Sequence, residues 1–346
     1  MYIARLAGGK GGAAMACPRE EYEALERLLV GPDGVRSADS RGREKPEEPC
    51  PVRTCFQRDV DRITHSKAFR RLRDKTQVFL RPEGDHYRTR LTHTLEVTRL
   101  ARTVARALHL NEDLAEAIGL GHDLGHTPFG HAGERALREL KGSFFHYEQS
   151  LRVVDRLEKD GAGLNLCYET RMGILNHTYG APDDTREATV ARLCDRIAYI
   201  NHDLDDALRA GILRPEDIPA RITEACGDRT SARINSFVTD LISGSAGGEI
   251  RMTEPMAEVF DFFHNYMYDA VYRNPTAKRE ESKVLGLLGS IYDRYLRYPE
   301  ELPELYRRLA REDGLEQAVC DYIAGMTDSY ALQLYSRLFI PAAWTG

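Results

Sequence analysis

"GLGHDLGHTPFGHAGE", residues 119–134, brings three histidines and two carboxylates together within sixteen positions. The segment "TPFG" should end a helix after His126, because Pro128 lacks an amide donor and disfavours helical geometry in the residue before it. A new helix is expected near His131, which places His131 and Glu134 on one face at a spacing of three. The stretch therefore predicts two helices joined by a sharp break, with polar side chains on both sides of it.

Helical periodicity extends outward from this stretch in both directions. Residues 91–108 carry a broad apolar stripe, and residues 190–208 repeat the pattern. Strand signals are confined to residues 76–80 and 86–89, which could pair as one short hairpin. The predicted class is all-α with that single hairpin, and further helices are expected over residues 20–30, 132–140, 149–159, 256–272, 284–298 and 314–339.

The composition is that of an ordinary globular protein. The chain has 346 residues, of which 42% are hydrophobic, enough for one large domain or two modest ones. It contains no run of eighteen apolar residues, and its first twenty residues lack the apolar core of a signal peptide. The seven cysteines are scattered without a C-x-x-C pair, which argues against a disulfide framework or a zinc knuckle. We expect a soluble cytoplasmic protein with no membrane partner.

Composition changes along the chain predict three regions. Residues 1–52 are read as a flexible glycine-rich leader, a helix and an irregular loop. Residues 53–215 form the compact core, and residues 216–346 form a helical C-terminal extension packed on it. The net charge is −6, yet residues 53–90 carry eleven Lys or Arg against five Asp or Glu. This segregation favours a localised anion site over an evenly solvated face, and leaves nucleic acid open as a partner without indicating it.

Four residues form a predicted metal site. His93 lies at the border of one apolar stripe, Asp195 lies beside buried positions of another, and His122 and Asp123 are adjacent. Each alone is read most simply as a satisfied core histidine or a helix-cap aspartate, but buried polar groups need partners. One shared divalent metal would satisfy all four. Two imidazoles and two carboxylates suit Mn²⁺, Fe²⁺ or Co²⁺, and Mg²⁺ less well, while Zn²⁺ stays open.

A second group lies beside this site. A histidine held by a carboxylate, here His131 with Glu134, is a usual arrangement for proton transfer near neutral pH. His146 follows near another expected helix start.

Phosphate and sugar contacts are expected on the flanking helices. Arg90 lies one turn before the first metal ligand, and Arg196 follows Asp195, so both could reach phosphate oxygens. Tyr199 and Asp203 lie ~6 Å and ~12 Å along the helix from Asp195, a spacing that suits an elongated ligand. A polar outer face is the simpler alternative for Asp203.

The residues His93, His122-Asp123 and Asp195 resemble the H…HD…D pattern of the HD-domain metal phosphohydrolases. The segments "RTRLTHTLEV", "GHDLGHTPFGHAGE", "DRIAYINHDLDDA" and "CDYIAGMTDSYA" are similar to the deoxyguanosine triphosphate triphosphohydrolase (dNTPase) branch. The likeness runs from about residue 37 to 208 and returns more weakly from 261 to 341. It implies an HD-domain helical bundle with additional C-terminal helices.

The resemblance also implies a reaction and roles for residues. The reaction is hydrolysis of a deoxynucleoside triphosphate at the α-phosphorus, releasing the deoxynucleoside and inorganic triphosphate. By motif position, the metal ligands would be His93, His122, Asp123 and Asp195, with His131 and Glu134 as the catalytic pair. The remaining matches are His126 and His146 near the phosphates, Arg90 and Arg196 on phosphate, Tyr199 and Asp203 on deoxyribose, and, more weakly, Gln77 and Tyr272 on the nucleoside side.

Combining both interpretations gives a hypothesis in which water attacks phosphorus in line and His131, oriented by Glu134, protonates the departing 5′ oxygen. Another HD-type nucleotide phosphohydrolase, acting on a monophosphate or a phosphodiester, is the alternative enzyme. A nucleotide- or nucleic-acid-binding regulator without turnover is the alternative outside catalysis. Homo-oligomers and activating nucleotides between subunits are usual in the resembled family.

Overall fold

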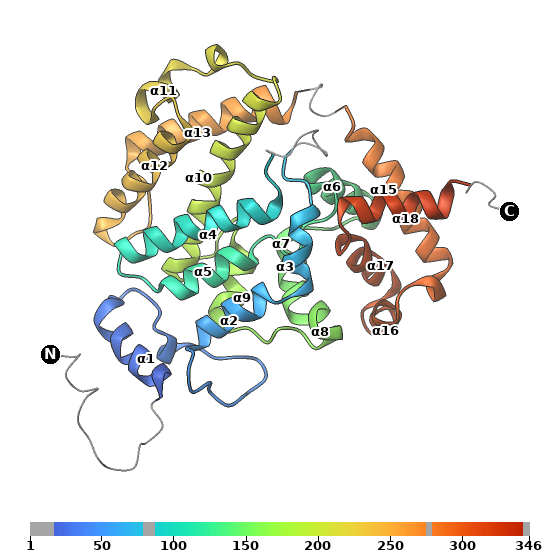
Figure 1. The fold of residues 1–346 in the computed structure, drawn as a ribbon, viewed down its shortest axis with the longest axis horizontal. Helices are drawn as coiled ribbons and strands as arrows, with labels where there is room; N and C mark the ends of the chain where they lie inside the picture. Colours follow the sequence, from blue (N-terminus) through green and yellow to red (C-terminus); the bar gives the residue numbers. More distant parts are fainter. Residues whose placement is uncertain (1–16, 79–86, 275–278, 342–346) are drawn as a thin grey trace.

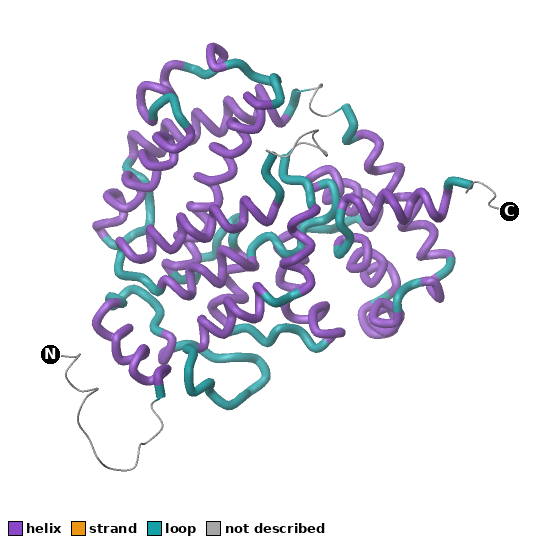
Figure 2. Tube along the Cα trace, in the orientation of Figure 1, coloured by secondary structure: helices purple, strands orange, loops and turns teal. Residues whose placement is uncertain are grey.

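The computed structural model describes residues 17–78, 87–274 and 279–341, and helices dominate all three stretches (Figures 1 and 2). The predicted all-α class is confirmed. Of the expected hairpin, one isolated bridge between Thr76 and Thr89 lies in the described residues, whereas residues 79–86 lie outside them.

A central bundle carries the periodic segments. Its helices are α2 (Cys55–Thr64), α4 (Arg90–Ala107), α5 (Glu112–Gly121), α9 (Tyr168–Asn176) and α10 (Arg186–Arg209). Helix α4 packs against α5 and α10, and the apolar stripes read from the sequence are the buried faces of α4 and α10. Threonine side chains cap both starts: Thr89 accepts the amide of Thr92, and Thr185 accepts the amide of Ala188.

Two further groups of helices flank this bundle on different sides in Figure 1. One group extends the core of the bundle through Phe237, Phe260 and Phe263, and comprises α11 (Ala220–Cys226), α12 (Thr230–Gly244) and α13 (Glu254–Met267). The other builds a separate apolar cluster around Leu137, Leu288 and Ile323, and comprises α6 (Gly130–Lys141), α15 (Ser282–Arg297), α16 (Glu304–Asp313), α17 (Leu315–Ala324) and α18 (Asp328–Phe339).

Further helices flank these groups. They are α1 (Pro18–Leu29), α3 (Lys67–Arg71), α7 (His146–Arg152) and α8 (Glu158–Gly161). The helix expected over residues 149–159 is interrupted by a π-helical turn, Val153–Leu157. A second π-helical turn, Tyr268–Tyr272, continues α13.

Two sequence predictions need correction. The helix expected to run through His126 ends at Gly121, and a turn follows because the chain passes directly against α7: a Cβ on Gly125 would lie 2.1 Å from the Ser150 nitrogen. The single helix expected over residues 314–339 is two helices. Helix α17 ends at Ala324, and α18 begins at Asp328 under a Thr327 cap that accepts the Tyr330 amide.

None of the helices described is long and apolar enough to cross a membrane.

Candidate active site and metal centre

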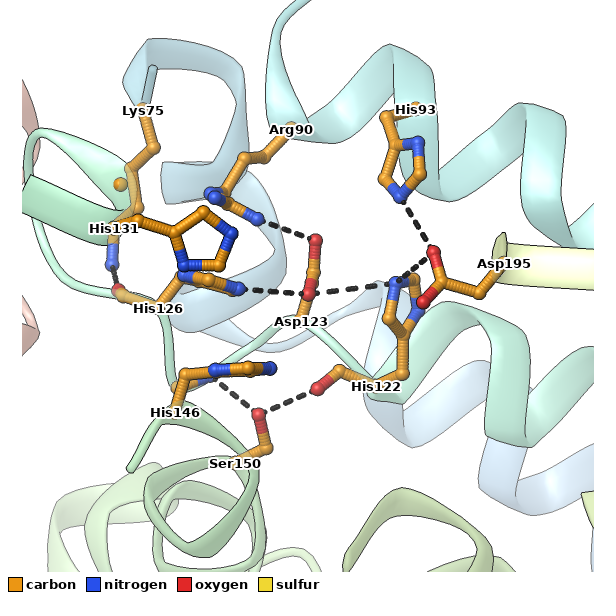
Figure 3. Close-up of polar contacts among 12 residues, drawn as sticks. Lys75, Arg90, His93, His122, Asp123, His126, His131, His146, Ser150 and Asp195 are labelled. Carbon is orange, nitrogen blue, oxygen red and sulfur yellow. Dashed lines mark hydrogen bonds and ion pairs between the residues drawn. The ribbon is translucent and has the colours of Figure 1, made fainter. Parts of the chain in front are cut away.

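The four predicted metal ligands converge from three parts of the bundle. His93 comes from α4, His122 and Asp123 from the turn after α5, and Asp195 from α10 (Figure 3). Ligand atoms of His93, His122 and Asp123 all lie within 4.8 Å of one another. Asp195 Oδ1 lies 3.0 Å from His93 Nε2 and 3.7 Å from His122 Nε2. The arrangement offers two imidazole nitrogens and two carboxylates to one point.

The protonation of His122 suits a metal ligand. Its Nδ1 lies 2.7 Å from the Gly119 carbonyl oxygen, which can only accept, so Nδ1 carries the proton. Nε2 therefore presents a lone pair, and it is buried with no hydrogen-bond partner among the residues that the structure describes. A metal-bound imidazole typically donates its other N–H to a backbone carbonyl in this way. These donors fit a divalent cation.

Asp123 lies at the centre of the cluster, as Figure 3 shows. Its Oδ2 accepts from Arg90 at 2.8 Å, and its Oδ1 lies 3.2 Å from His126 Nε2. Burial opposes ionisation of Asp123, but His122, His126 and Arg90 outweigh it and hold its pKa well below the usual range. The carboxylate is thus negative and available to a cation. His126, expected near phosphate, donates to Asp123 and stacks on the ring of His146 with centroids 4.0 Å apart.

The predicted catalytic pair lies past the break, on α6. His131 Nδ1 is 3.3 Å from Glu134 Oε2, and His146 Nδ1 is 3.2 Å from the same oxygen. Burial raises the pKa of Glu134, but hydrogen bonds from both imidazoles lower it far more. The side chain of His131 is 64% exposed, toward the pocket. Desolvation within the pocket and the charge of Arg90 lower the pKa of His131, and the hydrogen bond to Glu134 opposes that decrease.

The turn before His131 is strained. Phe129 adopts left-handed backbone angles of φ 64° and ψ 22°, which cost a non-glycine residue about 1–2 kcal/mol. Gly130 follows with φ 55°, and a Cβ there would lie 3.3 Å from Arg90 Nη2 and from the carbonyl oxygens of Thr76 and Gln77. The left-handed backbone and this close approach favour a glycine at position 130.

A pocket of about 570 Å³ opens over these residues. The predicted sugar-binding residues Tyr199 and Asp203 lie along its α10 wall. Tyr272 Oη donates to Asp203 Oδ2 at 2.6 Å, and Asp203 Oδ1 has no hydrogen-bond partner in the described part of the chain. Burial raises the pKa of Asp203 to about 6 and that of Tyr199 to about 12. Within residues 17–78, 87–274 and 279–341, Gln77 Oε1 and His126 Nδ1 are likewise buried without hydrogen-bond partners. Buried polar atoms are rarely left unpaired, so these atoms indicate a polar ligand.

Comparison with known proteins places this site in a family. A model of the HD domain matches residues 90–200, and a model of the phosphohydrolase-associated domain matches residues 250–337. A deoxyguanosinetriphosphate triphosphohydrolase-like protein of Caldanaerobacter subterraneus subsp. tengcongensis is 52% identical over 94% of this chain and 97% of its own. One of the same description from Desulfatibacillum aliphaticivorans is 46% identical over 93% of this chain and 98% of its own. The chain belongs to the deoxyguanosinetriphosphate triphosphohydrolase-like family.

Among solved structures, a hypothetical protein from Aquifex aeolicus is 22% identical, with a TM-score of 0.47 over 81% of this chain and 71% of that one. The family membership and the HD domain identify a nucleotide phosphohydrolase, and an HD domain implies a divalent metal, for which the cluster above provides donors.

The basic segment contributes less to this phosphohydrolase site than its charge suggested. Within the described part of residues 53–90, Arg90 is the Lys or Arg that lines the pocket. Most others form ion pairs elsewhere, as Arg62 does with Glu47 and Arg88 with Asp205. Arg196, predicted to contact phosphate, lines the pocket and also lies 5.0 Å from the centre of the Phe260 ring.

Two histidines of the site escaped the sequence prediction. His177, after α9, donates from Nδ1 to the Ile174 carbonyl at 2.7 Å and places Nε2 3.2 Å from His146 Nε2. His202 Nδ1 lies 3.4 Å from His93 Nδ1, on the side away from the ligand cluster. A signal existed for His202, because positions 195, 199 and 202 share one helix face. His177 stands alone in the sequence and carried no such signal.

Proposed function

We propose that this protein hydrolyses deoxynucleoside triphosphates, dGTP or another dNTP, to the deoxynucleoside and inorganic triphosphate with one divalent metal per site. The observation that carries the proposal is the single pocket that joins the ligand cluster, the His131–Glu134 pair and the Tyr272–Asp203 contact. Its volume suits a nucleotide-sized ligand. Mn²⁺, Fe²⁺, Co²⁺ and Mg²⁺ are the candidate metals, and Zn²⁺ stays open.

In this proposal each group has a defined task. A divalent cation held by His93, His122, Asp123 and Asp195 supplies electrostatic stabilisation at the α-phosphate. Arg90 and Arg196 bind phosphate oxygens. As water adds to the α-phosphorus and the bond to the 5′ oxygen breaks, His131 transfers its proton to that oxygen.

The neighbours of His131 fit the same reaction. Glu134 orients the His131 ring and favours its protonated form. His146 and His126 line the phosphate side of the pocket, and Asp203 Oδ1 can accept a hydrogen bond from a sugar hydroxyl. Gln77 and Tyr272 lie toward the nucleoside.

Product analysis tests the proposal. Purified, metal-loaded protein is incubated with each dNTP, and the products are separated by ion exchange. Release of triphosphate supports the proposal, whereas release of pyrophosphate or orthophosphate contradicts it. Cleavage of a monophosphate or a phosphodiester would favour the alternative enzyme, and tight binding without product would favour a regulator.

His131→Ala separates the two parts of the site. Turnover should be abolished while metal content, measured by elemental analysis, stays as in the wild type. Loss of metal would instead place His131 among the ligands.

We also propose that the protein acts as a cytoplasmic homo-oligomer that an activating nucleotide can stimulate at a subunit interface. Activity that appears only in mixtures of dNTPs would reveal the activator, and sedimentation would give the number of subunits. The three-region division at residues 52 and 215 is part of the same proposal, with residues 53–215 supplying most of the site.

A further inference from the structure

The active-site turn is held from the far end of the chain by one carboxylate. Asp328, the first residue of α18, is 2% exposed. Its Oδ1 accepts the Phe129 amide at 2.8 Å, and its Oδ2 accepts the Thr76 amide at 3.1 Å and the Thr76 hydroxyl. One side chain thus joins two segments that are distant in sequence.

A buried lysine makes a parallel connection. Lys75 Nζ donates to the carbonyl oxygen of His126 and, at 2.8 Å, to that of Ala324 at the end of α17. Lys75 is 3% exposed. The chain between α17 and α18 is therefore connected to both ends of the turn that separates His126 from His131: to its start through Lys75, and to its end through Asp328.

The segments held in this way carry groups that face the pocket. Gln77 follows Thr76 directly, and Gly130 follows Phe129 and lies against Arg90. The turn itself has two successive left-handed residues, a conformation that persists only where the surroundings fix it. Apolar contacts alone would be enough to hold α18 against its neighbours. The buried Asp328 carboxylate, which accepts hydrogen bonds from three donors, additionally fixes the position of the backbone at Phe129 and Thr76.

We infer that Asp328 is a positioning residue for the reaction: it fixes the Phe129–Gly130 turn against the Thr76–Gln77 segment, and thereby the place of His131 relative to Arg90 and Gln77. The C-terminal helices then control the geometry of a site to which they contribute none of the proposed metal ligands. The kinetic part of this inference rests on the proposed function, and the structural part does not.

The test compares Asp328→Asn with Asp240→Asn. Asp240 on α12 also accepts the amide and the hydroxyl of one threonine, Thr253, at 2.9 and 2.7 Å, but lies away from the pocket. Asn at position 328 keeps its volume yet offers an acceptor to one of its two partners only. Misplacing catalytic groups by about 1 Å can cost roughly 100-fold, so we expect kcat of Asp328→Asn to fall roughly tenfold or more. Metal content should be unchanged, and kcat of Asp240→Asn should equal that of the wild type.

Two variants of Thr76 test whether the loss of kcat depends on the number of hydrogen bonds that Asp328 accepts. Thr76→Val removes one of the three donors and should lower kcat less than Asp328→Asn does, whereas Thr76→Ser should restore it. A kcat for Asp328→Asn within twofold of the wild type, together with a lowered melting temperature, would make the residue a structural anchor and overturn the inference.

Hydrogen exchange provides the readout that needs no turnover. In metal-loaded protein, amide exchange in peptides covering residues 127–131 should accelerate in Asp328→Asn and stay unchanged in Asp240→Asn. Unchanged exchange in both variants would overturn the inference. If the wild type releases no triphosphate from any dNTP, the proposed function fails, and exchange alone decides the role of Asp328.

Discussion

The ring of His93, a proposed metal ligand, is oriented by residues that lie outside the proposed ligand set. Its Nε2 lies 3.0 Å from Asp195 Oδ1, so with a cation bound at Nε2 the ring would carry its proton on Nδ1 and donate to His202 Nδ1, 3.4 Å away. His202 Nε2 in turn lies 3.3 Å from Glu96 Oε2. Burial lowers the pKa of His202 to about 2, which keeps this ring neutral and able to accept. The contacts from Glu96 to His202 and from His202 to His93 thus orient the His93 ring that would hold the metal.

His202→Gln should therefore weaken metal binding. Loss of a hydrogen-bond partner of a ligating histidine typically costs 10- to 100-fold in metal affinity, and we expect a loss of about that size. Competition with a coloured chelator measures it. His65→Gln, which changes an exposed histidine at the end of α2, is the matched control and should bind metal as the wild type does. Equal affinity in both variants would exclude the role of His202.

In the proposed reaction, Glu134 sets the pH range in which His131 can donate a proton. Glu134 raises the pKa of His131 against the lowering effect of the pocket, so Glu134→Gln lowers that pKa further. A general acid is active in its protonated form, and a lower pKa means that the proton is lost at a lower pH. We expect kcat to begin its alkaline decline at lower pH in Glu134→Gln, and to be reduced at neutral pH.

The measurement is kcat from pH 5.5 to 9 with dNTP in excess. Glu148→Gln, an exposed carboxylate on the neighbouring helix α7, serves as the control for a general loss of negative charge. A shift of equal size in both variants would indicate a field effect and count against a specific role for Glu134.

Among the elements, the turn between Gly121 and α6 is the most sensitive. Gly130→Ala should destabilise the protein by about 1–2 kcal/mol through its left-handed backbone, and should also crowd Arg90. Gly42→Ala isolates the first effect, because Gly42 has φ 82° and a Cβ there would meet no atom within 4 Å. Chemical denaturation should give similar losses for both variants, while turnover should fall only in Gly130→Ala. Full activity in Gly130→Ala would show that the contact with Arg90 is dispensable.

For the whole molecule, the proposed centre would link metal binding to fold stability, because the proposed ligands come from α4, the turn after α5 and α10. A cation that binds only the folded state adds about 3–4 kcal/mol when its free concentration is 100 to 1,000 times Kd. Removal of the metal should lower the melting temperature of the wild type in calorimetry. It should not change that of His122→Ala, which lacks one ligand. A wild type that melts identically with and without chelator would contradict the proposed centre.

The long-range architecture was only partly predictable. Apolar periodicity suffices to predict α4 and α10, since their buried faces follow the 3.6-residue repeat, and it points His93 inward for the same reason. Periodicity says nothing about a left-handed residue such as Phe129, whose conformation depends on tertiary contacts. It also continues across residues 325–327, where Thr327 starts a new helix.

Pairing across the fold was equally hidden from local patterns. Asp203 and Tyr272 are far apart in sequence, and their hydrogen bond exists because the π-helical turn after α13 faces α10. The resemblance to dNTPases supplied Tyr272, whereas neither periodicity nor resemblance supplied His177 or Asp328, and the helix-face signal for His202 was not used.

The contact between Asp328 and the turn also bears on biosynthesis. Protein synthesis proceeds from the N-terminus, so a growing chain that has reached residue 327 already contains all four proposed metal ligands and the His131–Glu134 pair on α6. It still lacks the carboxylate that binds Phe129 and Thr76. In the proposed mechanism, a chain still being translated would therefore contain every proposed metal ligand before it contains the carboxylate that positions the turn.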